Sequence, residues 1–81
     1  MTQAEVFAKL QTIFDDVFLE PPKVSAELSA SDVDEWDSLI HISLIVAIEK
    51  AFGVRFRVGE TEATKNVGEL ADLIAKRQLE K

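Results

Sequence analysis

The stretch that decides the fold is residues 37–53, DSLIHISLIVAIEKAFG, because nearly every position in it suits one continuous helix. Asp37 precedes the apolar run and is a favoured N-cap residue, since its carboxylate can accept a hydrogen bond from a first-turn amide. Gly53 follows the run, where a left-handed backbone ends helices at little steric cost. The stretch therefore predicts a helix over residues 39–52, with Ser38 at its start.

The apolar residues of this helix cover an arc wider than one core-facing stripe requires. One stripe consists of Leu39, Ile42, Ile45, Val46 and Phe52. A second set lies beside it and consists of Ile40, Leu44 and Ile48. The spacing leaves two interpretations of the second set open, a docking patch for a partner or a core shared among three helices.

Two further helices are predicted on either side of this one. Thr2 and Glu5 have capping-box spacing, and the residues behind them recur at helical intervals as far as Phe18. Pro21 and Pro22 then exclude a continuation, because proline lacks the amide donor. Asn66 with Glu69 repeats the capping logic before an amphipathic segment that extends to about Gln78.

The segments that connect the helices differ in the structures their sequences predict. Residues 19–36 show no period, but spaced apolar residues favour an ordered, irregular loop that is held on the core. Residues 54–58 alternate like a strand but have no partner strand, so we expect an extended connector with Val54 and Phe56 turned inward. Residues 59–65 suggest a short helical turn. Residues 1–81 are thus predicted to be one all-α domain, a bundle of three helices with a possible short fourth.

Composition excludes several classes of function. The net charge is −6 and the sequence holds one histidine and no cysteine, which argues against a nucleic-acid binder, a disulfide framework or a multi-His metal site. No apolar run approaches the ~20 residues needed to cross a bilayer, and the first residues do not resemble a secretory signal. We therefore expect a cytoplasmic, monomeric protein with no resident metal and no membrane insertion, which is not an enzyme.

Ser38 is the residue most open to chemistry. A helix N-terminus has unpaired amide donors and a partial positive charge, so a phosphate on a serine there is favourably placed. An ordinary capping serine is the simpler interpretation of the spacing alone. His41 invites a Ser–His nucleophile, but no orienting third group is evident. The acidic residues before Ser38 lack the glycine and distal glutamate of a calcium loop.

The segment also resembles a known family. Trp36-Asp37-Ser38-Leu39, then Ile42, Ala47-Ile48-Glu49 and Phe52-Gly53-Val54, is similar to the Asp-Ser-Leu block of acyl carrier proteins. The similarity extends over essentially the whole chain, including the long loop between the first and second helices and the final helix. It implies a bundle of the acyl-carrier type in which Ser38 bears a 4′-phosphopantetheine arm derived from coenzyme A.

The resemblance also implies partners. A phosphopantetheinyl transferase would modify Ser38, with Asp37 and Leu39 presenting it. A loading enzyme and downstream synthase or transferase enzymes would then exchange acyl or related intermediates, held on the arm as thioesters. Ile40, His41 and Ser43 stand where carriers of bacterial fatty-acid synthesis usually have acids, which favours a specialised freestanding member. An aminoacyl, peptidyl or D-alanyl carrier remains an alternative, as does an adaptor that lacks the arm.

The charge is concentrated next to this serine. Five acidic residues fall between Glu27 and Asp37, with no basic residue among them. We expect this acidic segment to recognise basic rims on partner enzymes. The predicted partner-recognition residues are Asp34, Glu35, Asp37, Leu39, Ile40 and His41.

Overall fold

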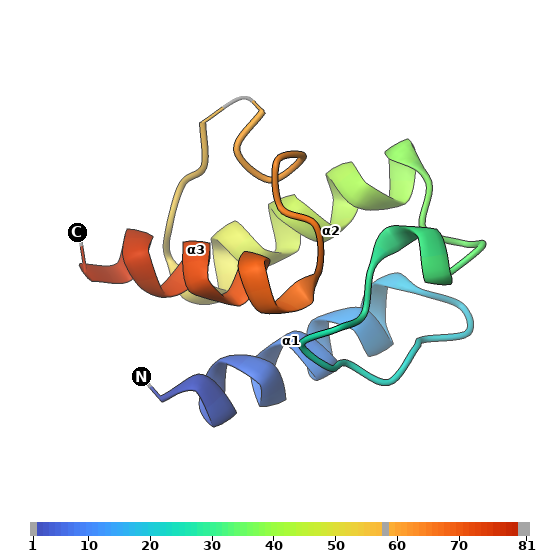
Figure 1. The fold of residues 1–81 in the computed structure, drawn as a ribbon, viewed down its shortest axis with the longest axis horizontal. Helices are drawn as coiled ribbons and strands as arrows, with labels where there is room; N and C mark the ends of the chain where they lie inside the picture. Colours follow the sequence, from blue (N-terminus) through green and yellow to red (C-terminus); the bar gives the residue numbers. More distant parts are fainter. Residues whose placement is uncertain (1, 58, 80–81) are drawn as a thin grey trace.

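The structure is a computed structural model that describes residues 2–57 and 59–79. It confirms the all-α class and the long loop between the first two α-helices (Figure 1). Within the described residues the elements are α1 (Gln3–Val17), the 3₁₀ helix η1 (Ala30–Asp32), α2 (Ser38–Phe52) and α3 (Val67–Leu79). The short fourth helix suggested for residues 59–65 is a series of turns, whose hydrogen bonds do not continue as a helix.

Local capping explains where the helices begin and end. The Thr2 side chain accepts a bond from the Glu5 amide while the Glu5 carboxylate accepts from the Thr2 amide, which is the predicted capping box. Asp37 caps α2, and Gly53 ends it in the left-handed region at φ 65°. Asn66 accepts a bond from the Glu69 amide at the start of α3.

The core lies where the three α-helices face one another. In Figure 1, α1 runs opposite to α2 and α3, so the first turn of α2 lies at the far end of the bundle from the first turn of α1. Fully buried side chains come from all three helices, and the largest of them are Phe14, Leu10, Leu44, Ile48, Ile74 and Val67. Burial of apolar surface stabilises a folded chain by about 25 cal/mol per Å², so we expect this core to be the main favourable contribution to the free energy of folding.

The buried face of α2 decides between the two interpretations of its apolar arc. Leu44 and Ile48 have no exposed surface and Phe52 is 4% exposed, while Ile40 packs against the same cluster. The interpretation of Ile40, Leu44 and Ile48 as a docking patch is therefore wrong, because they form part of the shared core. The first stripe is instead mostly exposed: Leu39 is 76%, Ile42 60% and Val46 43% exposed.

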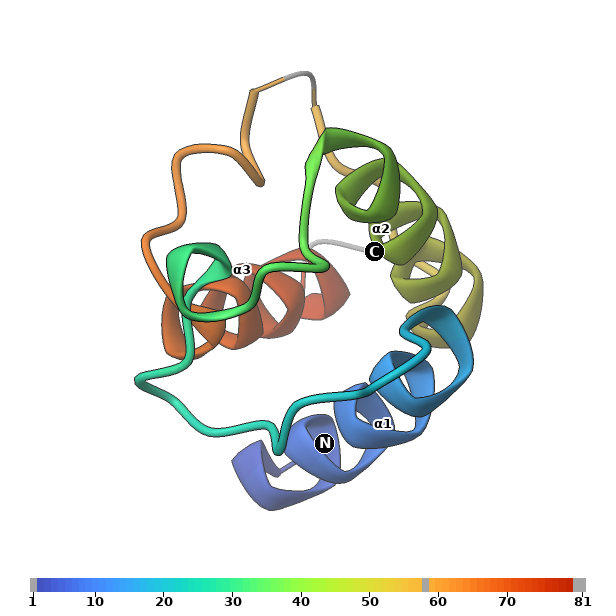
Figure 2. The same cartoon turned by 90° about the vertical axis from the view of Figure 1, so that its right-hand side faces the viewer.

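The α1–α2 loop (residues 18–37) is ordered and irregular, as predicted. It leaves α1, crosses to the start of α3 and returns to α2 (Figure 2). The amides of Val67 and Gly68 donate to the carbonyls of Leu28 and Ala26 over 2.8 and 3.0 Å. Its spaced apolar residues pack on the core as expected, namely Val24, Leu28, Val33 and Trp36.

The α2–α3 loop (residues 53–66, of which residue 58 is outside the described part) starts as the extended connector that the sequence predicts. Val54 is buried and Phe56 packs against the core, while the Phe56 amide donates to the Glu49 carboxylate over 3.0 Å. Further along, the Glu60 carboxylate accepts a bond from the Arg57 amide and pairs with Arg77 of α3. The Phe56–Glu49 bond thus holds the start of this loop against α2, and the Glu60–Arg77 pair holds its later part against α3.

Glu60 gives the fold a testable dependence on pH. The bond from the Arg57 amide, and secondarily the Arg77 charge, lower the pKa of Glu60 from its ordinary value of 4.5. The folded state then binds fewer protons than the unfolded state, so this stabilisation is present above about pH 4.5 and is lost as pH falls below it. We expect Glu60→Gln to flatten the loss of stability as the pH falls below about 4.5, measured by urea titrations at a series of pH values. An unchanged acid limb in the variant would contradict this role.

Candidate functional site

Ser38 lies at the first residue of α2 with its side chain exposed. The Asp37 backbone is extended, and its carboxylate accepts a bond from the Ile40 amide over 2.9 Å. Because Asp37 performs the capping, the Ser38 hydroxyl is not needed for it. The first amides of a helix have no intrahelical acceptor, so the hydroxyl stands at the positive end of the helix dipole.

The acidic residues before Ser38 divide into two kinds. Asp34 and Asp37 are exposed. Glu35 is half-buried, and its carboxylate accepts bonds from the amides of Leu19 and Glu20 over 2.7 and 3.2 Å. Glu35 therefore joins the end of the α1–α2 loop to its beginning. Its carboxylate is only partly exposed and is already engaged by two backbone amides.

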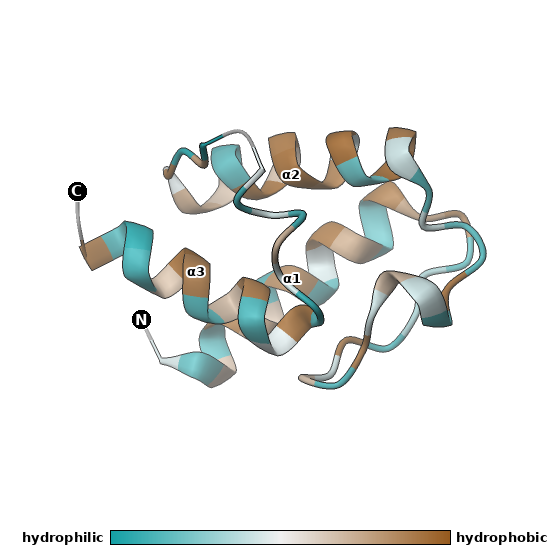
Figure 3. Cartoon of the chain, turned by 45° about the horizontal axis from the view of Figure 1, so that its top comes forward, coloured by the Kyte–Doolittle hydropathy of each residue, from teal (hydrophilic) through white to brown (hydrophobic). Residues whose placement is uncertain are grey.

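The apolar side chains after Ser38 also divide. Leu39, Ile42 and Val46 are exposed on the outer side of α2, which is the most continuously hydrophobic of the three helices (Figure 3). Ile40 faces the core instead. We call Leu39, Ile42 and Val46 the outer apolar strip of α2. Periodicity could not single it out, because the core face of α2 is equally apolar.

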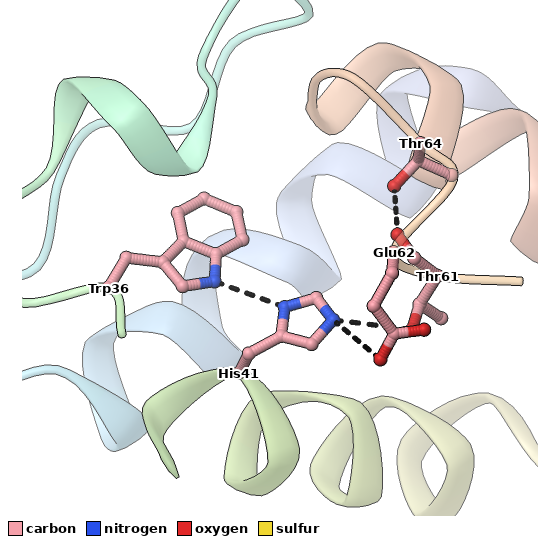
Figure 4. A network of polar contacts seen from close by, with 5 residues as sticks. All are labelled: Trp36, His41, Thr61, Glu62 and Thr64. Carbon is pink, nitrogen blue, oxygen red and sulfur yellow. Dashed lines mark hydrogen bonds and ion pairs between the residues drawn. The ribbon is translucent and has the colours of Figure 1, made fainter. Parts of the chain in front are cut away.

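His41 is half-buried and joins two loops (Figure 4). Its Nδ1 accepts a bond from Trp36 Nε1 over 3.2 Å, and its Nε2 lies 3.2 Å from Thr61 Oγ1. The Glu62 carboxylate is 4.0 Å from the same Nε2. With both ring nitrogens engaged in this way, His41 is not arranged as a base for Ser38.

A hollow of about 450 Å³ opens beside Ser38. One wall is formed by the end of the α1–α2 loop and the start of α2, and a second by the α2–α3 loop, with Leu70 of α3 also lining the hollow. The sequence interpretation missed this second wall, which consists of Thr61, Glu62, Thr64, Lys65 and Asn66. Apart from the helix cap formed by Asn66, these residues carry no motif, and only the path of the α2–α3 loop brings them to Ser38. Within the described residues, no group of three or more His, Cys, Asp or Glu side chains is placed to hold a metal ion.

Known proteins share this sequence and this fold. No protein-family model matches the chain. An acyl carrier protein of Thermosynechococcus vestitus is 36% identical over 75 residues, 91% of this chain and 93% of the relative. One from Acidothermus cellulolyticus is 34% identical over 76 residues, 93% of this chain and 90% of the relative. A solution NMR structure of a holo acyl carrier protein from Geobacter metallireducens superposes with a TM-score of 0.76 at 38% identity, covering 98% of this chain and 87% of that one.

The helical bundle with one exposed serine at the start of its second α-helix defines a small carrier domain. The chain belongs to the acyl carrier protein family. Members of this family are carriers rather than catalysts. Along the described residues, none of the helices combines the length and the apolar character needed to span a bilayer.

Proposed function

We propose that this protein carries acyl or related intermediates as thioesters on a 4′-phosphopantetheine arm attached to Ser38, and delivers them to partner enzymes. The observation that carries the proposal is the exposed Ser38 hydroxyl, placed by the Asp37 cap at the first turn of α2 in a chain of this family. The attachment would join the Ser38 oxygen to the pantetheine phosphate of coenzyme A, with release of the nucleotide portion.

The residues around Ser38 suit such an arm. The hydroxyl is unobstructed, and the hollow beside it offers both apolar and hydrogen-bonding walls, including Trp36, Thr61 and Leu70. The positive end of the α2 dipole favours a phosphodiester on its first residue. The chain has no cysteine, so the thiol that forms the thioester would be supplied by the arm.

Intact-mass measurement tests the proposal. The purified chain is incubated with coenzyme A, Mg²⁺ and a broad-specificity phosphopantetheinyl transferase, and we expect a mass increase of one phosphopantetheine group. An established carrier protein in a parallel reaction shows that the transferase is active. No mass increase beside a fully modified reference carrier would contradict the proposal.

The partners of this function would be the transferase, an acyl- or aminoacyl-loading enzyme, and downstream synthase or transferase enzymes. We place their docking surface on the exposed Asp34 and Asp37 together with the outer apolar strip of α2. Glu35, Ile40 and His41, which the sequence also suggested, contribute less in this proposal because their side chains are engaged within the bundle. The surface then combines a charged rim with an apolar centre, as protein interfaces commonly do.

The negative charge of the docking surface should increase the rate at which this protein meets the transferase. We expect Asp34→Asn to slow modification of Ser38 by about two- to fivefold at low salt, the factor that corresponds to ~0.4–1 kcal/mol for an exposed charge pair. The difference should shrink as salt screens the charge. Initial rates at two ionic strengths check this.

Asp72→Asn is the matched control, because Asp72 is exposed on α3 and loses the same charge outside the α1–α2 loop. We expect its rate to stay near that of the unaltered chain. Equal slowing by both variants would mean that net charge, rather than Asp34, governs the encounter. Glu35→Gln is a poorer probe, since the Glu35 carboxylate also holds the amides of Leu19 and Glu20.

A further inference from the structure

Three segments that are distant in the sequence meet at His41. Trp36 belongs to the end of the α1–α2 loop, His41 to the first turns of α2, and Thr61 to the α2–α3 loop (Figure 4). The three side chains form one row of hydrogen bonds, with Trp36 to His41 and His41 to Thr61 both at 3.2 Å. Along the chain, Trp36 lies two residues before Ser38 and His41 lies three residues after it. It borders the hollow beside that serine.

The chemistry of the row fixes the position of the imidazole proton. The Trp36 indole has an N–H donor and no acceptor, so His41 Nδ1 must accept and must therefore be unprotonated. The proton of a neutral His41 is then on Nε2, where it is donated to Thr61 Oγ1. His41 is thus the side-chain hydrogen-bond partner of both the buried Thr61 and the half-buried Trp36.

Trp36 is in turn anchored on the core. Its ring packs edge-on against Phe14 and Phe18 of the α1 end, with ring centroids 5.4 and 5.8 Å apart. Its backbone amide donates to the Val33 carbonyl over 3.1 Å. A bond between Trp36 and His41 therefore links the buried aromatic cluster to α2, across the backbone that presents Ser38.

We propose that neutral His41 is a positioning residue for Ser38, which holds the Trp36 end of the α1–α2 loop and the α2–α3 loop together, and that protonation of His41 breaks its bond to the Trp36 indole. The inference concerns the site of the proposed function, but it is tested on the unmodified chain without transferase or coenzyme A. A failure of Ser38 modification would leave it standing, and its own failure would leave the carrier function standing.

Protonation changes one side of the row more than the other. A proton on Nδ1 would face the Trp36 N–H, so two donors would oppose each other and that bond would be lost. The Nε2 side keeps its donor to Thr61, and Glu62 at 4.0 Å is placed to accept from the charged ring. Asp37 and Lys65 are the other charged residues that line this hollow. The uncharged neighbours of the row are Leu70, which also lines the hollow, and Phe14 and Phe18, which pack against Trp36.

NMR tests the inference sharply because the chain has one tryptophan and one histidine. With neutral His41, we expect the Trp36 indole N–H to exchange with solvent about three- to tenfold more slowly than in His41→Ala, the protection expected of one hydrogen bond. As the pH is lowered, that protection should disappear with the midpoint of the His41 ring resonances. The backbone amides of Asp37 and Ser38 should shift with the same midpoint.

His41→Asn is the decisive variant. Asparagine places an acceptor oxygen close to where Nδ1 lies but does not titrate, so we expect indole protection that persists at low pH. A merely structural role for His41 would not produce this difference in pH dependence. Indole exchange at the unprotected rate while His41 is neutral would overturn the inference. So would equal protection of the indole when the His41 ring is charged, measured in a chain that is still folded by far-ultraviolet circular dichroism.

Discussion

Replacement of Ser38 with alanine is expected to abolish the mass increase that the unaltered chain shows with coenzyme A and a phosphopantetheinyl transferase. The Ser38 oxygen is the atom that would form the phosphodiester, and alanine has none. The effect is all-or-none rather than a reduction in rate. Electrospray mass spectrometry of the intact chain, after a reaction long enough to modify the unaltered protein fully, measures it.

Ser43→Ala is the matched control for this variant. Ser43 is also an exposed serine of α2, and its hydroxyl is removed by the same substitution. We expect Ser43→Ala to be modified completely. A mass increase that survives in Ser38→Ala would place the arm on another residue and would contradict the assignment.

Ser38→Ala should leave the fold intact, which makes its chemical result interpretable. The Asp37 carboxylate, rather than the Ser38 hydroxyl, accepts the amide of the first turn. Exposed substitutions that break no cap usually change stability by less than about 0.5 kcal/mol. An unmodified Ser38→Ala chain with an unchanged denaturation midpoint would therefore report the loss of an attachment atom and not the loss of structure.

The features that could be predicted from the sequence are those that depend on near neighbours in the chain. Thr2 with Glu5, Asp37 and Gly53 each act within a few residues, so their types and spacing were enough to place the ends of helices. The same holds for Ser38, whose exposure follows from its place at the start of α2. The family resemblance rests in part on the local block Asp37-Ser38-Leu39, and the comparisons confirm that the chain belongs to this family.

The features that could not be predicted depend on how distant segments meet. Both sides of α2 are apolar, so periodicity could not tell that Leu44 faces the core and Leu39 faces outward; the positions of α1 and α3 decide it. The acceptor role of Glu35 and the approach of Thr61 to His41 join residues 16 and 20 positions apart. No spacing rule covers such pairs, so the second wall of the site was found only in the structure.

The same substitution at two positions of α2 should separate the core from the docking surface. Leu44 has no exposed surface and Leu39 is 76% exposed, although both are leucines of one helix. We expect Leu44→Ala to lower the free energy of unfolding by about 2–5 kcal/mol, because it leaves a cavity where Leu44 now contacts the core. For a domain whose total stability is on the order of 5–15 kcal/mol, that loss is a large fraction.

Leu39→Ala should change the unfolding free energy by less than about 0.5 kcal/mol, because its side chain is already in water. The two variants undergo the same change in helix propensity, so the difference between them isolates burial. Urea denaturation followed by circular dichroism measures both. Leu39→Ala should instead slow modification of Ser38, since it removes the largest exposed apolar side chain next to the attachment site. Equal losses of stability at both positions would mean that the outer apolar strip is packed against the bundle, and the proposed docking surface would then have to lie elsewhere.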